Sequence, residues 1–177
     1  RKPAEFCALV GITHPNTSTT AAINMTDSQQ NAWLDAVLAN TLAGKPVQNI
    51  SVDYPDISIG DAYSLQRELV RKLQDHGGWG QVYGYKAALT AEPAQQAMGI
   101  NDPIVGVLFE RAVHQADGAT AIKTDRPVLL ETEVGFTLGK PITKPVTEHD
   151  VFDAITHCRA MIELASPNLK QRPTSVD

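Results

Sequence analysis

Two stretches in the first half of the chain place apolar residues at helical spacing. The first stretch begins at Asp27 or Ser28 and ends at Gly44, and the second runs through Leu65 and Leu73 and stops at the glycine pair 77–78. Both patterns predict amphipathic helices that pack one face on a core. The segment between them, 45–58, contains two prolines and is predicted to be a loop.

The middle of the chain is predicted to form mainly β-sheet. A strand is predicted over 82–89, a short helix over 92–98 with Gly99 as its cap, and a strand from Pro103 to Phe109. Two further β segments are expected, near Val113 and over 119–123.

The last third places acidic residues inside apolar runs. A long strand is predicted over 128–138, and it carries Glu131 and Glu133. Thr147 is suited to cap a helix whose apolar face is formed by Val151, Ala154, Ile155 and Cys158. Glu163 follows in another apolar run, which reads as a strand but could also continue that helix.

This order of elements, two helices and then a mostly β region, predicts an α/β (α+β) fold. With 177 residues, the chain is long enough for about one domain. Residues 1–26 show little periodicity and are expected to form a poorly ordered leader, so the predicted domain spans 27–177.

Composition excludes several classes of function. The formal net charge is −5 and the chain has no dense basic tract, which argues against nucleic acid as a partner. No apolar stretch approaches the roughly 18 residues of a membrane span, so membrane insertion is not expected. Two cysteines without metal-ligand spacing favour a reducing, cytoplasmic compartment.

The pair Glu131 and Glu133 is the sharpest chemical signal. Side chains alternate along a strand, so both carboxylates project from the same face, and Glu163 offers a third. One interpretation is a solvated stripe on the wet face of a sheet. The other is a site for a hard divalent cation of the Mg²⁺ type, which would relieve the repulsion between the acids.

Lys86 is the second candidate, because it lies in a predicted strand among small and apolar residues. A lysine there either protects a strand edge from association or serves a site. In a site it would bind a substrate carboxylate or donate a proton.

These motifs together resemble the fumarylacetoacetate hydrolase superfamily, and within it the 2-keto-4-pentenoate hydratase and 4-oxalocrotonate decarboxylase branch. The resemblance extends from about Ala62 to about Leu169. It rests on the following ordered segments: Ala62 to Gln66, Gly84-Tyr85-Lys86 with Leu89-Thr90, Gly106-Val107-Leu108, Glu131-Thr132-Glu133 with Phe136, Leu138 and Gly139, and Ile162-Glu163-Leu164.

The resemblance implies a mixed β-roll of the fumarylacetoacetate hydrolase C-terminal-domain type, with N-terminal helices packed against it. It also implies one Mg²⁺ or Mn²⁺ held by Glu131, Glu133 and Glu163, with Lys86 as the catalytic residue beside the substrate oxygen. The remaining substrate-binding positions that it implies are Tyr63, Gln66 and Leu89. Since the family continues beyond the third acid, we expect the domain to be truncated at its C-terminal end.

The implied activity is a lyase reaction of aromatic-compound catabolism, in which a hydratase adds water to a 2-hydroxy-2,4-dienoate or 2-oxo-4-enoate. A 4-oxalocrotonate-type decarboxylase is the alternative, and a hydrolase of carbon–carbon bonds is disfavoured because no histidine occupies a matching motif. Departures from the branch at Ala91 and Leu164 leave open a non-catalytic partner subunit. An interaction domain without metal is a further alternative. The expected partner is a small 2-oxo acid, in a homo-oligomer or an assembly with a related subunit.

Overall fold

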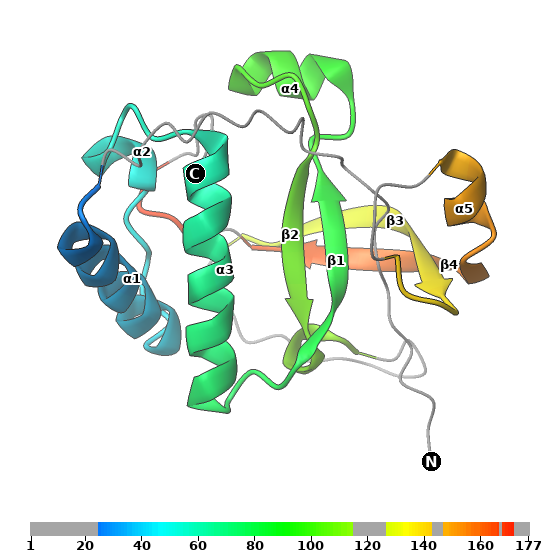
Figure 1. Cartoon of the computed structure of the whole chain (residues 1–177), viewed down its shortest axis with the longest axis horizontal. Helices are drawn as coiled ribbons and strands as arrows, with labels where there is room; N and C mark the ends of the chain where they lie inside the picture. Colours follow the sequence, from blue (N-terminus) through cyan, green and yellow to red (C-terminus); the bar gives the residue numbers. More distant parts are fainter. Residues whose placement is uncertain (1–24, 115–126, 143–146, 167, 172–177) are drawn as a thin grey trace. The chain divides into compact units, whose positions relative to one another are not determined.

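The computed structural model describes residues 25–114, 127–142, 147–166 and 168–171. These residues form two compact units. One unit contains 80–88 and the described parts of 105–166, and the other contains 25–79, 89–104 and 168–171. Figure 1 labels the helices and strands of both units. The single domain expected over 27–177 stays a prediction.

The helical unit is built on α1 (Asp27–Leu42) and α3 (Ile59–His76), as the periodicity predicted. Thr26 begins α1 with a reciprocal capping box: its hydroxyl accepts from the Gln29 backbone, and the Gln29 side chain accepts from the Thr26 N–H. Met25 is already buried. Residues 1–24 of the expected leader lie outside the described residues, so the leader stays a prediction, while Met25 and Thr26 belong to the ordered start of α1.

The core of this unit joins α1 to α3 through a small set of apolar residues. Met25, Leu34, Ile50 and Leu65 form it. Side chains packed against it are Trp33, Tyr54, Ile57 and Leu69. Ile50 belongs to α2 (Ile50–Asp53), a four-residue helix inside the segment predicted as a loop. That prediction was wrong because one helical turn is too short to show a period.

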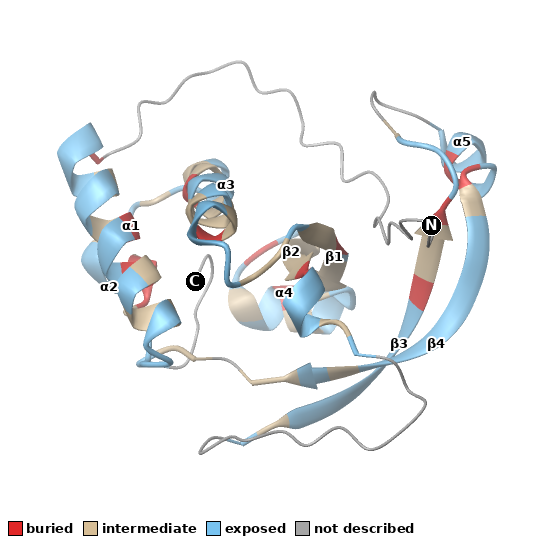
Figure 2. Cartoon of the chain, turned by 90° about the horizontal axis from the view of Figure 1, so that it is seen from below, coloured by how far each residue is buried: buried red, intermediate tan, exposed pale blue. Residues whose placement is uncertain are grey.

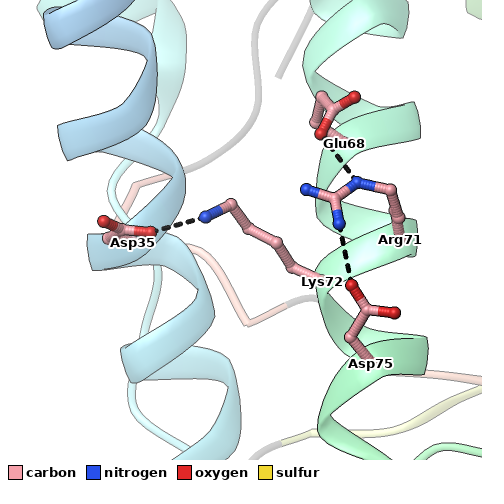
Figure 3. A network of polar contacts seen from close by, with 5 residues as sticks. All are labelled: Asp35, Glu68, Arg71, Lys72 and Asp75. Atoms are coloured by element: carbon pink, nitrogen blue, oxygen red, sulfur yellow. Dashed lines mark hydrogen bonds and ion pairs between the residues drawn. The ribbon is translucent and has the colours of Figure 1, made fainter.

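Charged residues connect the exposed sides of the two long helices (Figure 3). The Lys72 ammonium lies 2.8 Å from Asp35 of α1, while Arg71 bridges Glu68 at 3.1 Å and Asp75 at 2.8 Å along α3. Pairs as exposed as those of Arg71 contribute roughly 0.2 to 1 kcal/mol each. Of these pairs, Lys72–Asp35 joins α1 to α3 and adds to the apolar contacts between the two helices.

The segment 168–171 returns to the helical unit. Val47 and Leu169 form a parallel bridge, and the Lys170 N–H donates to the Val47 carbonyl at 2.9 Å. The buried Asn49 side chain accepts from the Gln171 N–H at 3.1 Å. The loop before α2 is thus fixed by residues more than a hundred positions later.

In the other unit, β1 (Val82–Ala88) and β2 (Ile104–Phe109) form a two-stranded sheet, drawn with opposed arrows in Figure 1. Between them in sequence is α4 (Glu92–Met98), with Pro93 in its first turn and Gly99 as a left-handed cap. All three elements were predicted. The strand expected near Val113 is absent, because a 3-10 turn, η1 (Glu110–Ala112), follows β2 directly; the segment 119–123 lies outside the described residues.

The second sheet pairs β3 (Leu129–Leu138) with β4 (Ile155–Ala165) in antiparallel register. The predicted long helix after Thr147 was wrong: α5 spans only Glu148–Phe152, and Ile155 and Cys158 belong to β4. Thr147 does cap α5, and the hydrogen bond from its hydroxyl lowers the pKa of Asp150.

Both strands are largely exposed (Figure 2). The face opposite the acids carries Leu130, Val134, Ile162 and Leu164, which are 74%, 56%, 67% and 40% exposed. Helices and antiparallel strands together confirm a mixed α and β fold. No helix in the described ranges is long and apolar enough to cross a membrane.

Candidate functional site

Three carboxylates meet on one face of the β3–β4 pair. Alternation along β3 places Glu131 and Glu133 on the same side, and the register sets Glu163 of β4 directly opposite Glu131. One carboxylate oxygen from each of the three lies within 4.8 Å of the others. The pairing of the two strands therefore brings together residues that lie up to 32 positions apart in the sequence, Glu131 and Glu163.

Lys86 reaches this cluster from β1 in the same unit. Its ammonium donates to Glu163 Oε1, and the two side chains are 30% and 22% exposed. Its aliphatic stem lies over Gly106 of β2, where an added Cβ would be 3.1 Å from Lys86 Cγ and 3.4 Å from Cδ. The absence of a side chain at Gly106 leaves room for this path.

The donor set fits a hard divalent cation. A Mg²⁺ ion with oxygen ligands at about 2.1 Å separates those ligands by about 3 to 4.2 Å, and the three carboxylates each place an oxygen within 4.8 Å of the others. Three carboxylates and one ammonium leave an excess of two negative charges, which a divalent ion would balance. Without such an ion, the cluster holds Glu131 and Glu133 close together, an arrangement that like-charge repulsion disfavours.

The other residues expected at the site lie elsewhere along the chain. Tyr63 and Gln66 are half-buried on α3 in the helical unit. Leu89 follows β1 with a φ of 56°, the left-handed conformation that a leucine rarely adopts. Its carbonyl accepts a 2.8 Å hydrogen bond from the buried Gln95 side chain. The structure brings Lys86 and the three acids together, and the roles of Tyr63, Gln66 and Leu89 stay predictions.

Sequence reasoning gave no separate role to two residues beside the cluster. Gly106 belongs to one of the motifs that carry the resemblance. The structure adds that, because Gly106 has no side chain, the stem of Lys86 can pass over it. Met161 pairs with Glu133 in the register and shares the acidic face. The alternation of β4, counted back from Glu163, was the signal that could have found Met161.

Comparisons with known proteins agree on one group of enzymes, although no protein-family model matches the chain. The chain is 36% identical to 2-oxo-hept-4-ene-1,7-dioate hydratase of Escherichia coli over 67% of its own length and 44% of the relative's. It is 25% identical to 2-keto-4-pentenoate hydratase of Paraburkholderia xenovorans, over 82% of the chain and 54% of the relative. It is 30% identical to 4-oxalocrotonate decarboxylase of a Pseudomonas species, over 56% of the chain and 37% of the relative. The chain thus spans about half the length of these relatives.

A solved structure is similar in fold. It is the 4-oxalocrotonate decarboxylase of Pseudomonas putida G7 in complex with magnesium and adipate, with a TM-score of 0.69 and 20% identity. The match covers 87% of this chain and 58% of that one.

Proposed function

Since the chain belongs to the family of 2-keto-4-pentenoate hydratases and 4-oxalocrotonate decarboxylases, we propose that it carries the metal site of a lyase acting on small 2-oxo acids. The reaction we assign is addition of water to a 2-hydroxy-2,4-dienoate or 2-oxo-4-enoate in aromatic-compound catabolism. The observation that carries this proposal is the cluster of Glu131, Glu133 and Glu163, with the Lys86 ammonium bound to one of its carboxylates.

Glu131, Glu133 and Glu163 would hold one Mg²⁺ or Mn²⁺. When bound, such an ion acts as a Lewis acid and a template for the carboxylate and 2-oxo oxygens of the substrate. The similar solved structure, which contains magnesium, supports this assignment. The protein's own contribution is the pairing of β3 and β4, whose register places three oxygen donors on one face.

Lys86 is the residue to which we assign proton donation. Its ammonium lies against Glu163, so it also lies beside any 2-oxo acid that occupies the cluster. A cation in that place stabilises negative charge that develops on the 2-oxo oxygen during proton transfer. A proton taken up from water at the partly exposed Lys86 side chain would return the neutral amine to the ammonium.

Three more residues are assigned to substrate binding. Leu89 would act through its backbone, because its left-handed conformation sets the direction of the chain after the Lys86 strand. Tyr63 and Gln66, both on α3, are two further residues to which we assign substrate binding. The fold we propose around these residues is the β-roll of the fumarylacetoacetate hydrolase type, of which β1 to β4 would be a part.

Decarboxylation is the second candidate, favoured by the similarity of fold to a 4-oxalocrotonate decarboxylase. Loss of CO₂ and ketonisation of a dienol both place negative charge on the 2-oxo oxygen, so the same residues serve either reaction. The departures at Ala91 and Leu164 favour a third assignment, a partner subunit without turnover. We further propose a cytoplasmic homo-oligomer or a pairing with a related subunit.

Turnover tests these assignments. The protein with Mg²⁺ is supplied with 2-hydroxypenta-2,4-dienoate, and loss of the dienoate absorbance is followed beside CO₂ release from 4-oxalocrotonate. Glu131→Gln should abolish Mg²⁺-dependent hydration, whereas Glu148→Gln, at an exposed acid of α5, should leave it unchanged. Equal rates in the wild-type protein and Glu131→Gln would remove Glu131 from the site. Mg²⁺ binding without turnover of either acid would identify a partner subunit.

A further inference from the structure

Four neighbouring positions on the acidic face of the β3–β4 pair surround the point where the carboxylates meet. The register sets Glu131 opposite Glu163 and, two residues further along β3, Glu133 opposite Met161. Such positions are about 5 to 7 Å apart across and along the strands, so their side chains can touch one ligand together. Three of the four side chains are carboxylates, and the fourth is a thioether, which is uncharged and a poor ligand for a hard cation. Met161 is thus the position of the four that suits an apolar group.

The Met161 side chain lies along the surface of the sheet. An added Cβ at Gly135 would collide with Met161 Sδ and would be 2.9 Å from Cγ and 3.8 Å from Cε. Gly135 is buried, whereas every residue of β3 before it is exposed. The glycine therefore leaves the space in which the thioether lies, and the thioether covers the glycine. Since 37% of Met161 is still exposed, its outer side is an apolar surface beside the carboxylates.

A 2-oxo acid bound at the cluster would have one polar end and one apolar end. Its carboxylate and 2-oxo oxygen would be held at the acids, so the rest of its carbon chain must extend to one side. A chain that lies over a carboxylate removes water from a charged group, which costs free energy. A chain that lies over a thioether removes apolar surface from water on both partners, which is favourable. The face therefore favours a bound acid whose chain lies against Met161.

The same face has another apolar position at the opposite end of the cluster. Leu129 is 58% exposed and pairs with Ala165. It lies two residues before Glu131, about 7 Å along the strand and outside the three acids. Met161 instead shares the level of Glu133, one of the three. A carbon chain that begins at the centre of the cluster therefore reaches Met161 first.

We propose that Met161 is a positioning residue, whose thioether contacts the carbon chain of a bound 2-oxo acid beyond C3 and directs it along the sheet toward Gly135. The inference rests on the proposed function, because it takes the acid cluster as the place where the carboxylate and the 2-oxo group bind. Met161 takes no part in proton transfer or in holding the ion. Its replacement should therefore change how affinity depends on chain length and leave the Mg²⁺ site intact.

The test compares two acids with the same polar end: pyruvate, whose chain ends at C3, and 2-oxohexanoate, which is longer by three methylenes. Met161→Gln keeps the length of the side chain but makes it polar, whereas Met161→Leu keeps it apolar. Leu129→Asn tests the opposite direction along the face, and Met98→Gln, at a half-buried methionine of α4 in the other unit, is the control. Mg²⁺ alone is titrated first into each protein, and each acid is then titrated calorimetrically into the Mg²⁺-loaded protein.

We expect the wild-type protein, Met161→Leu, Leu129→Asn and Met98→Gln to bind 2-oxohexanoate about fivefold more tightly than pyruvate, because one side of three methylenes is removed from water. Met161→Gln should bind both acids equally, with unchanged affinities for Mg²⁺ and for pyruvate. Equal affinities in the wild-type protein, a preference that survives in Met161→Gln, or its loss in any other variant would overturn the inference alone. The absence of a saturable Mg²⁺ site, or of pyruvate binding to the Mg²⁺-loaded protein, would overturn the proposed function, and the inference with it.

Discussion

Glu131 and Glu163 lie directly opposite each other in the antiparallel β3–β4 pair, and Glu133 lies on the same face two residues along β3. Carboxylates in such positions repel each other unless a cation lies between them. The Lys86 ammonium forms its ion pair with Glu163, one of the three. The arrangement therefore costs stability in the metal-free protein and gains it when a divalent ion is bound.

Neutralising one acid should separate these two effects. Glu131→Gln is expected to raise the free energy of unfolding of the metal-free protein by about 0.5 kcal/mol, because it removes repulsion at an exposed pair. The same variant should lose the stabilisation that the wild-type protein gains on addition of Mg²⁺. Urea denaturation with Mg²⁺ and with a chelator measures both quantities. A variant that is destabilised in chelator would show that Glu131 makes a favourable contact instead.

Removing the ammonium should stop the chemistry without emptying the metal site. Lys86→Met keeps the aliphatic stem over Gly106 and is expected to lower kcat by at least about a hundredfold, the usual contribution of a general acid. Its Mg²⁺ affinity should be unchanged or higher, since a positive charge beside Glu163 is lost. Lys72→Met, at a lysine whose ion pair joins α1 and α3, is the control and should keep full turnover.

Gly106 should be needed for the position of Lys86. A Cβ there would be 3.1 Å from Lys86 Cγ, closer than ordinary van der Waals contact, so Gly106→Ala must displace the stem. We expect kcat to fall by about tenfold or more, because small displacements of a catalytic group are costly. Gly60→Ala is the matched control, since its Cβ would meet only Ser58 Oγ at 3.7 Å. Equal kcat values for the two variants would show that Lys86 adapts to the added methyl group.

Gln95 should stabilise the turn that follows the Lys86 strand. Its side chain is 7% exposed and donates to the carbonyl of Leu89, the residue with the left-handed backbone. Gln95→Leu leaves that carbonyl without this donor and is expected to destabilise the protein by about 1 to 2 kcal/mol. Gln96→Leu, at the exposed neighbour on α4, should change stability by less than about 0.5 kcal/mol. Thermal unfolding of the two variants side by side makes the comparison.

Local signals allowed some elements to be predicted from the sequence. Gly99 caps α4, and Gly77 ends α3, each in the left-handed conformation. The E-x-E pair was placed on one strand face from alternation alone. These predictions succeed because capping, backbone restriction and side-chain alternation act within a few residues.

The elements that were predicted wrongly are ones whose structure depends on contacts between residues far apart in the sequence. Ile155 and Cys158 continue the helical spacing of Val151, yet they belong to β4 because pairing with β3 overrides a local pattern. The contact between Lys86 and Glu163 joins residues 77 positions apart, and nothing in either segment specifies the other. Pairing register likewise brought Arg159 and Met161 to the acidic face, where sequence reasoning had not placed them.

Calorimetric titration of Mg²⁺ tests the central claim most directly. The wild-type protein should show one saturable site, and Glu131→Gln and Glu133→Gln should each weaken it by at least about tenfold, because each removes one charged oxygen ligand. Glu148→Gln, an exposed acid outside the cluster, should bind Mg²⁺ as the wild-type protein does. No saturable heat in the wild-type protein, or equal affinities in all four proteins, would contradict a metal centre at these three carboxylates.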